Sequence, residues 1–397
     1  MIKTKNYLAA LIAAASLSMA VLSASADDQH GDLDGDGRIS KSDCQILRDY
    51  LLTNRSDIYS QAADMDGDYC LTAKDLAAMK RQILNPSQGG PQQTEPQQTE
   101  PQQTEPQQTE PQQTQPSPSG QTNASEYMKK IRDSYVTDVP QNMIAERGGD
   151  LQHISYFSKQ INREKGAFVW TPPGYDPSQK YPVMYVNHGI HGNEFSMIGD
   201  FSIVESATGL IKSGEAVPMI IVFTSMYTNP NSDTCAGITA EEEPFYDAFL
   251  EDLTECLMPY VAEHYPIKSG RENTAIGGFS MGGRESLYIG VSRPDLFGYI
   301  AASSPAPGVT PAVDQFFAHP GSMSEDQFRF SAPYEPYVLM IAGGTADGMV
   351  NVAPENYSKL LTKNGCDHIF ISVPGGGHDG SVGVPLFYNF IRSLFKA

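Results

Sequence analysis

Short apolar runs recur through the last two thirds of the chain and alternate with segments of helical periodicity. The runs predict strands at residues 167–171, 183–187, 219–225, 275–278, 299–303, 338–342 and 369–373. The segments between them predict helices at 244–264, 282–292, 354–364 and 384–395. Continuous apolar strands that alternate with helices indicate an α/β fold with a mostly parallel sheet covered on both faces. In such folds the active site lies at the carboxyl ends of the strands.

The first residues follow a different pattern. Lys3 and Lys5 precede an apolar stretch at 8–22, and Ala24-Ser25-Ala26 matches the small-residue pattern of a cleavage site. The apolar stretch is short and is interrupted by serines, which argues against a transmembrane anchor. We therefore expect residues 1–26 to be a signal peptide, and the mature protein to be secreted and extracellular.

A polar repeat separates two modules. Residues 91–115 contain the unit PQQTE four times and then PQQTQ, with no aromatic or aliphatic residue. Such a segment cannot build a core and is expected to be an extended, semi-rigid linker. The predicted organisation is a signal peptide (1–26), a small module (27–85), a linker (86–124) and a large module (125–397).

Charge and cysteine content narrow the choice of partner. The formal net charge is −20, and the longest run of Lys or Arg has two residues, so neither a nucleic acid nor a membrane surface is an expected partner. The five cysteines are an odd number, and their pairing does not follow from the sequence. No CxxC spacing occurs, which argues against a zinc site.

The small module contains one acidic pattern twice. The segments DLDGDGRISKSD (32–43) and DMDGDYCLTAKD (64–75) both have carboxylates at positions 1, 3, 5 and 12. This is the scheme of a calcium loop of the EF-hand type, in which position 7 contributes a backbone carbonyl. An amphipathic helix is predicted after each loop, at 44–52 and 76–84. Tyr69 replaces the loop glycine in the second copy, so the second site is expected to be weaker.

These two loop–helix units resemble the type I dockerin, the docking module of cellulosomal enzymes. The resemblance implies a small all-α module, two structural calcium ions and a cohesin domain of a scaffold protein as partner. The ligands that it implies are Asp32, Asp34, Asp36, Arg38, Ser40 and Asp43 for the first ion, and Asp64, Asp66, Asp68, Cys70, Thr72 and Asp75 for the second. The positions that would read the partner are Lys41-Ser42 and Ala73-Lys74, and these pairs differ from each other.

Ser280 is the candidate nucleophile of the large module. It stands in the motif GFSMG (278–282), between a predicted strand and a predicted helix. This strand–turn–helix context is what a nucleophile elbow requires, because small flanking residues let the chain turn sharply and expose the hydroxyl. A serine hydroxyl is a weak nucleophile, so it needs a base, and the base needs an orienting carboxylate.

The base and the acid are expected after later strands. His378 lies in the segment GGGHDG (375–380), directly after the strand predicted at 369–373. Asp347 follows the strand predicted at 338–342 and is preferred as the acid. Asp379 adjoins the histidine too closely to orient its ring easily. Asp314 and His319 lack the context of a strand end.

An oxyanion hole is expected from two backbone N–H groups. One belongs to the residue after the nucleophile, Met281, and the other to a loop after an early strand. The segment NHGIHG (187–192) fits that loop, and Ile190 is preferred because Gly189 permits the turn just before it. His188 is interpreted as a residue that braces the loop.

The large module resembles the esterase D-like family of α/β hydrolases, and within it the feruloyl and acetylxylan esterases of carbohydrate esterase family 1. The resemblance runs from about residue 149 to the end. It rests on the motifs WTPPGYD (170–176), YPVMYVNHGIHGNE (181–194), GGFSMGG (277–283), RPDLFGYIAASSPA (293–306), GTADGMV (344–350) and GGGHDG (375–380). It implies an α/β-hydrolase fold with Ser280, Asp347 and His378 as the triad, Met281 and Ile190 as oxyanion donors, and no cofactor for catalysis.

These features together predict a secreted, cellulosomal serine esterase that removes acyl groups from plant cell-wall xylan, feruloyl groups first and acetyl groups second. Tyr227, Phe245, Tyr246 and Phe316-Phe317 are candidates for an aromatic acyl pocket, or for packing. Two alternatives stay open, an acyltransferase of the same fold and an inactive carbohydrate-binding module. Product analysis with sugar acceptors separates the first from an esterase, and binding of xylan by an inert protein would indicate the second.

Overall fold

The computed structural model describes residues 31, 33, 38–53, 63, 65, 73–84 and 124–397. The predicted signal peptide, most of the two calcium loops and the repeat linker lie outside these residues. The boundaries predicted for the four segments therefore stay predictions. Within the described ranges, no helix has both the length and the apolar character that crossing a membrane requires.

A twisted sheet forms the centre of residues 124–397. Its strands run in the order β1 (Asp150–Ser158), β2 (Arg163–Thr171), β4 (Ile220–Thr224), β3 (Val183–Asn187), β5 (Thr274–Phe279), β6 (Tyr299–Ser303), β9 (Val338–Gly344) and β10 (Ile369–Val373). β2 pairs with β1 and β4 in antiparallel fashion, and the other neighbours are parallel. The mostly parallel sheet confirms the predicted α/β class.

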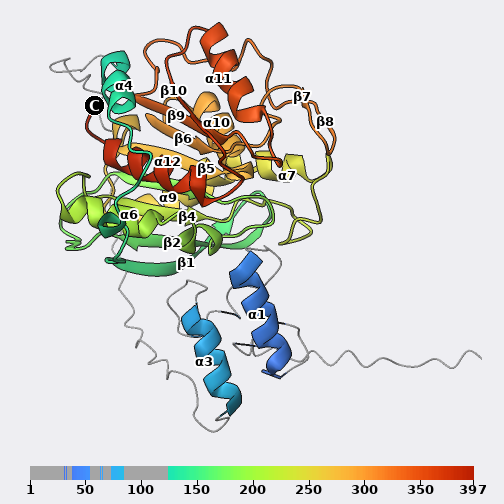
Figure 1. The fold of residues 1–397 in the computed structure, drawn as a ribbon. Coiled ribbons are helices and arrows are strands. Elements are labelled where there is room, and N and C mark those ends of the chain that lie inside the picture. Colours follow the sequence, from blue (N-terminus) through green and yellow to red (C-terminus); the bar gives the residue numbers. More distant parts are fainter. Residues whose placement is uncertain are drawn as a thin grey trace, which may run out of the picture.

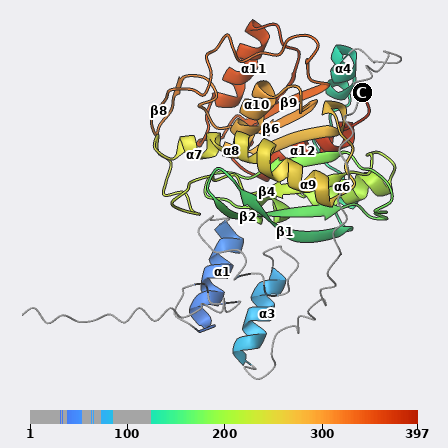
Figure 2. The same ribbon diagram turned by 180° about the vertical axis from the view of Figure 1, so that it is seen from behind.

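Helices cover both faces of the sheet. α12 (Gly380–Ser393) and α6 (Ile203–Lys212) pack together on the face that is toward the viewer in Figure 1. α9 (Met258–His264) and α10 (Met281–Ser292) cover the opposite face, which Figure 2 shows. α10 contacts β3, β5 and β6, and α11 (Ala353–Lys363) contacts β9 and β10. Strands β3, β4 and β6 are buried at every position, as their continuous apolar runs predict.

The remaining elements of residues 124–397 are short or lie at the edges. They are α4 (Ala124–Asp133), α5 (Ser196–Gly199), α7 (Glu243–Asp247), α8 (Phe249–Asp252), a π-helical turn (Leu253–Leu257), two 3₁₀ turns (Gln141–Met143 and Arg271–Asn273) and the hairpin of β7 (Ala312–Val313) with β8 (Ala318–His319).

The segment 244–264 was predicted as one helix and instead forms α7, α8, the π-helical turn and α9 in succession. Pro259 accounts for the π-helical turn before α9, because proline has no N–H to donate to the carbonyl one turn earlier. Strand β1 was not predicted. Its buried positions alternate with exposed ones near its end, which is the pattern of an edge strand rather than of a continuous apolar run.

The small module is all-α in its described residues. α1 (Lys41–Thr53) and α3 (Ala73–Leu84) contact each other, and Leu47, Ala63 and Met79 are fully buried between them. Both helices begin a few residues before the starts predicted from the sequence.

Candidate active site

Ser280 occupies the sharp turn between β5 and α10. Its backbone has a φ of 55° and a ψ of −117°, a conformation that is rare for a residue with a side chain. The turn can close because the neighbouring glycines, Gly278 and Gly282, have no side chain. A Cβ on Gly278 would lie 2.4 Å from the backbone of Gly282, and a Cβ on Gly282 would lie 2.3 Å from the carbonyl oxygen of Asn187. This geometry is that of a nucleophile elbow.

Backbone hydrogen bonds fix the elbow to its surroundings. The N–H of Ser280 donates to the carbonyl of Ser303 at the end of β6, at 2.9 Å. The carbonyl of Ser280 accepts from the N–H groups of Arg284 and Ala306, each at 3.0 Å. The turn is therefore tied both to its own helix and to the chain that leaves the neighbouring strand. A serine held in this way keeps its position without support from a mobile loop.

His378 and Asp347 lie together beyond the ends of β10 and β9. The Nδ1 atom of His378 is 2.8 Å from Oδ2 of Asp347, and the Asp347 side chain is fully buried. The histidine ring also packs on Phe279, the residue before Ser280, with 4.5 Å between the ring centres. The structure thus brings all three predicted triad residues to the same edge of the sheet.

Asp347 is held on both of its oxygens. Oδ1 accepts the N–H groups of Met349 and Val350 at 3.0 and 3.2 Å, and Oδ2 faces His378. Burial opposes its ionisation, but these hydrogen bonds and the histidine lower the pKa of Asp347 below its ordinary value. Asp379 has a different task, because its Oδ1 accepts the N–H of Ser381 and caps α12.

The loop after β3 lies against the elbow. A Cβ on Gly189 would be 3.6 Å from the Cβ of Ser280, so the two turns are in contact. Ile190 and Met281, the predicted oxyanion donors, both line the pocket that contains Ser280. Met281 is the first residue of α10, where backbone N–H groups have no partner within the helix.

His188 braces this loop, as the sequence analysis proposed. Its Nε2 accepts the N–H of Met226 after β4 at 2.9 Å, so Nδ1 carries the proton that it donates to the carbonyl of Gly189 at 2.6 Å. Burial lowers the pKa of His188 to about 4, which keeps the ring neutral. His191 has a positive φ of 63°, and its N–H donates to Tyr246 Oη at 3.2 Å.

A mostly apolar pocket opens beside Ser280. Of the aromatic residues suggested by the sequence, Tyr246, Phe316 and Phe317 line it. Tyr227 packs behind Tyr246, with 5.3 Å between the ring centres, and Phe245 packs on Tyr227.

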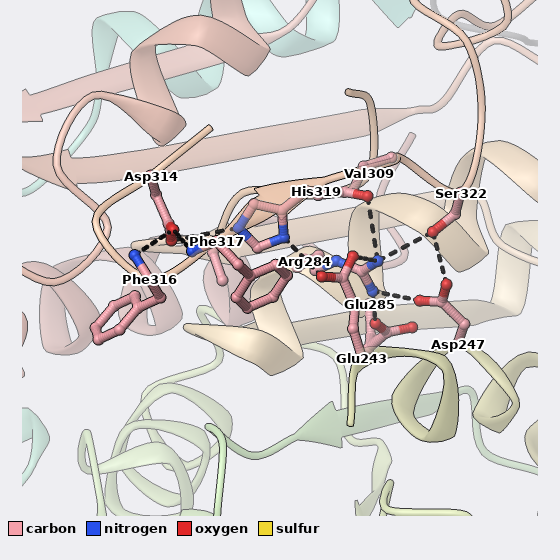
Figure 3. Close-up of polar contacts among 12 residues, drawn as sticks. Glu243, Asp247, Arg284, Glu285, Val309, Asp314, Phe316, Phe317, His319 and Ser322 are labelled. Atoms are coloured by element: carbon pink, nitrogen blue, oxygen red, sulfur yellow. Dashed lines mark hydrogen bonds and ion pairs between the residues drawn. The ribbon is translucent and has the colours of Figure 1, made fainter. Parts of the chain in front are cut away.

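One wall of this pocket is polar, and its role was not predicted from the sequence. It consists of Glu243 from α7, Asp314 at the tip of the β7–β8 hairpin, and His319 in β8. Figure 3 shows His319 between the two carboxylates, with Nδ1 2.6 Å from Glu243 Oε2 and Nε2 3.3 Å from Asp314 Oδ2. His319 had been expected in a loop without a strand, and its partner Glu243 is 76 positions away, so no local motif indicates the contact.

Arg284 connects this wall to the elbow. It is fully buried, its Nη2 lies 2.7 Å from Glu243 Oε1, and its Nη1 contacts Asp247 and Glu285. Nη2 also donates to the carbonyl of Gly308 and to Ser322 Oγ (Figure 3). Buried charges persist only when they are paired and hydrogen-bonded, and this guanidinium meets both conditions. Burial raises the pKa of its neighbour Glu285 to about 8.

In the small module, Asp43 and Asp75 are the two loop-closing carboxylates, and both are fully buried. Asp43 accepts the N–H groups of Leu33 and Ser40, each at 2.7 Å, and Asp75 accepts the N–H of Met65 at 2.9 Å. These bonds draw each loop back onto the start of its helix. Carboxylate oxygens are hard ligands of the kind that calcium binds. The other predicted carboxylate ligands, with Cys70 and Thr72, lie outside the described residues.

The positions predicted to recognise the cohesin lie in the first turns of the two helices. Lys41 and Ser42 begin α1 and are exposed, and Ala73 and Lys74 begin α3. Arg38, whose carbonyl is a predicted ligand, is exposed just before α1. The four cysteines within the described residues, Cys44, Cys235, Cys256 and Cys366, are free thiols.

A serine on a nucleophile elbow, at the carboxyl edge of a mostly parallel sheet and near a His–Asp pair, defines a serine hydrolase of the α/β-hydrolase fold. Comparison with known proteins agrees. The Esterase family model matches residues 158–342, and the model of the dockerin type I domain matches residues 30–84.

Solved structures give the family. A CE1 ferulic acid esterase from Anaeromyces mucronatus, solved in complex with ferulic acid, is 41% identical, with a TM-score of 0.63, over 66% of this chain and 98% of that one. The same esterase without substrate has a TM-score of 0.62 at 40% identity. The chain belongs to the CE1 esterases, which are carboxylic-ester hydrolases, and it also carries a type I dockerin domain.

Curated relatives are longer proteins. An endo-1,4-beta-xylanase/feruloyl esterase from Xylanibacter ruminicola is 31% identical over 157 residues, which are 38% of this chain and 21% of that protein. Endo-1,4-beta-xylanase Y from Acetivibrio thermocellus is 29% identical over 178 residues, or 42% of this chain and 15% of that protein. The chain thus matches about a fifth or less of the length of these relatives.

Proposed function

We propose that this protein is a secreted esterase that removes feruloyl groups from plant cell-wall xylan. The observation that carries the proposal is the His378–Asp347 pair at 2.8 Å, beside the elbow that presents Ser280 to an aromatic-lined pocket. The A. mucronatus esterase solved with ferulic acid supports a feruloyl acyl group. The two xylanase relatives support xylan as the polymer.

In the proposed reaction, His378 Nε2 takes the hydroxyl proton of Ser280 while Oγ attacks the ester carbonyl carbon. Asp347 accepts a hydrogen bond from Nδ1 of His378, so the ring presents an unprotonated Nε2. The negative charge of Asp347 then stabilises the imidazolium that forms. The N–H groups of Met281 and Ile190 hold the negative oxygen of the tetrahedral intermediate.

The intermediate then breaks its bond to the sugar oxygen. His378 returns the proton to that oxygen, the sugar alcohol leaves, and the acyl group stays on Ser280. Water repeats the attack with His378 again as the base, and the second intermediate releases the free acid and restores the serine. The residues named for this cycle require no cofactor.

The decisive test compares the unaltered protein with Ser280→Ala on methyl ferulate, acetylated xylan and p-nitrophenyl acetate. The unaltered protein should release ferulate, and the variant should lose about 10⁴-fold or more of the rate while keeping its fold. Full activity in Ser280→Ala would refute the nucleophile. Release of acetate without any release of ferulate would replace the feruloyl assignment by an acetylxylan esterase.

For the small module we propose a docking role on a cellulosomal scaffold. Type I dockerin domains bind calcium, and the buried carboxylates of Asp43 and Asp75 fit such sites. We propose two calcium ions, held by the residues predicted from the sequence, and a cohesin domain as the partner. Lys41-Ser42 and Ala73-Lys74 are the proposed contacts. A signal peptide at residues 1–26 would export the protein to that scaffold.

A further inference from the structure

Asp314 is held at the tip of the β7–β8 hairpin and is one of the residues that line the pocket of Ser280. Its Oδ1 accepts the backbone N–H groups of Phe316 and Phe317 at 2.8 and 3.0 Å, which closes the hairpin turn. Asp314 lines the pocket together with these two aromatic residues. The carboxylate is therefore built into the turn that also carries the aromatic wall.

The second oxygen of Asp314 is not engaged in the turn. Oδ2 lies 3.3 Å from His319 Nε2, a separation longer than the 2.7–2.9 Å typical of a charge-assisted hydrogen bond. Within the described residues, that nitrogen forms no hydrogen bond. The side chain of Asp314 is 16% exposed, and the residue lines both the pocket of Ser280 and the neighbouring pocket beside Asn356. Burial opposes ionisation, but the N–H groups of Phe317 and Phe316 and the histidine lower the pKa of Asp314.

A line of polar contacts fixes Asp314 relative to the nucleophile. The ring of His319 packs against Phe317 at a tilt, with 4.1 Å between the ring centres. Its Nδ1 is tied to Glu243, and Glu243 is tied to Arg284. Arg284 lies on α10, and its backbone N–H donates to the carbonyl of Ser280. Buried groups thus link the hairpin to the elbow, and Figure 3 shows the contacts among Asp314, His319, Glu243 and Arg284.

We propose that Asp314 accepts a hydrogen bond from the phenolic hydroxyl of the acyl group, and that His319 is the positioning residue that holds Asp314 for this contact. The proposal rests on the feruloyl esterase function proposed above and adds the residue that selects a hydroxylated ring. In a pocket with otherwise mostly apolar walls, an ionised carboxylate favours a ligand that brings a donor. A ring without that donor leaves Oδ2 of Asp314 without this hydrogen bond.

The test uses two esters that differ only at the para oxygen, methyl p-coumarate and methyl 4-methoxycinnamate. The unaltered protein should prefer the first by about 10- to 100-fold in kcat/KM, because the second cannot donate to a charged acceptor. Asp314→Ala should reduce this ratio to about 1. Asp314→Asn keeps an acceptor for the Phe316 and Phe317 N–H groups, and it should give an intermediate ratio.

His319→Gln should also reduce the ratio. The matched control is His153→Gln, because His153 is paired with Glu194 at 3.1 Å but does not line the pocket. That control should leave the ratio unchanged. A purely structural role for the hairpin would slow both esters equally and leave the ratio as it was, so an unchanged ratio in Asp314→Ala and Asp314→Asn would overturn the proposal.

Two further outcomes keep the inference separate from the proposed function. If the unaltered protein hydrolyses neither aromatic ester but does hydrolyse p-nitrophenyl acetate, the feruloyl function fails, and this inference fails with it. If it hydrolyses both esters equally well, the function stands and the inference is overturned. Inhibition of the unaltered protein by the free acids gives an independent check, because p-coumarate should inhibit more strongly than 4-methoxycinnamate.

Discussion

The Nδ1 atom of His378 lies 2.8 Å from Oδ2 of Asp347, although the two residues are 31 positions apart and follow different strands. The contact forms because β9 and β10 are parallel neighbours, so the loops at their carboxyl ends meet. The strand order alone therefore places an acid beside a base, and the elbow after β5 lies at the same edge of the sheet.

Asp347→Asn should lower kcat on methyl ferulate by about 10³- to 10⁴-fold, because an amide leaves His378 in the wrong tautomer without moving it. The loss in free energy of unfolding should be much smaller than the loss of transition-state stabilisation that the fall in kcat represents. Steady-state kinetics and thermal unfolding check both expectations. Asp379→Asn is the matched control next to the histidine, and a comparable loss of kcat in that variant would argue against Asp347 as the orienting acid.

Arg284→Met should destabilise the protein by about 3–5 kcal/mol, because it leaves Glu243, Asp247 and Glu285 without their buried cation. Urea unfolding measures the loss. Arg293→Met offers the comparison, since Arg293 pairs with Asp295 at the surface, where such a pair contributes about 0–1 kcal/mol. Equal losses in the two variants would show that the buried network contributes no more to the free energy of unfolding than a surface ion pair does.

The stability contributed by His319 should decline at alkaline pH. Burial opposes its charge, but Glu243 from α7 and Asp314 from the hairpin raise the pKa of His319 above its ordinary value. A group whose pKa is raised on folding contributes fully below its unfolded pKa, about 6.5, and the contribution is lost as the pH rises through the folded pKa. Unfolding of the unaltered protein and of His319→Gln, measured from pH 5.5 to 9, should therefore converge toward high pH. A gap that widens with pH would contradict this sign.

Removal of calcium by a chelator should abolish the docking function of the small module and leave the activity of the large module intact. Binding to a cohesin should fall by orders of magnitude, because metal binding supplies folding energy to small metal-binding domains. Hydrolysis of methyl ferulate should be unchanged, because no catalytic residue belongs to the small module. Isothermal titration and an esterase assay on the same sample test both parts, with excess calcium as the reversal. Loss of hydrolysis would mean that the catalytic module depends on the metal.

The sequence predicted those elements whose pattern is complete within one segment. β3, β6 and β10 have the predicted bounds because each is a continuous apolar run. The elbow was found because its glycines surround Ser280 within a few residues. β1 was missed because part of its surface is exposed, and β7 and β8 were missed because strands of two residues carry no periodicity.

The polar wall was missed for a related reason. Asp314 and His319 were set aside as catalytic candidates since neither follows a long strand, and that criterion does not detect groups that bind rather than react. Their roles depend on Glu243 and Arg284, which are distant in sequence and come close only when α7, α10 and the hairpin pack. No residue type at a fixed spacing encodes such a contact.

The anchoring of the hairpin has a consequence for altering the enzyme. Asp314 and His319 secure its two ends, while Phe316 between them is 41% exposed and outside the buried network. Acyl preference can therefore be varied at Phe316 with little cost to the elbow or to the His–Asp pair, whereas Gln315 donates to the carbonyl of Gly348 and Phe317 packs on His319. Saturation substitution at Phe316 is a short route from this scaffold to esterases that accept other aromatic acids.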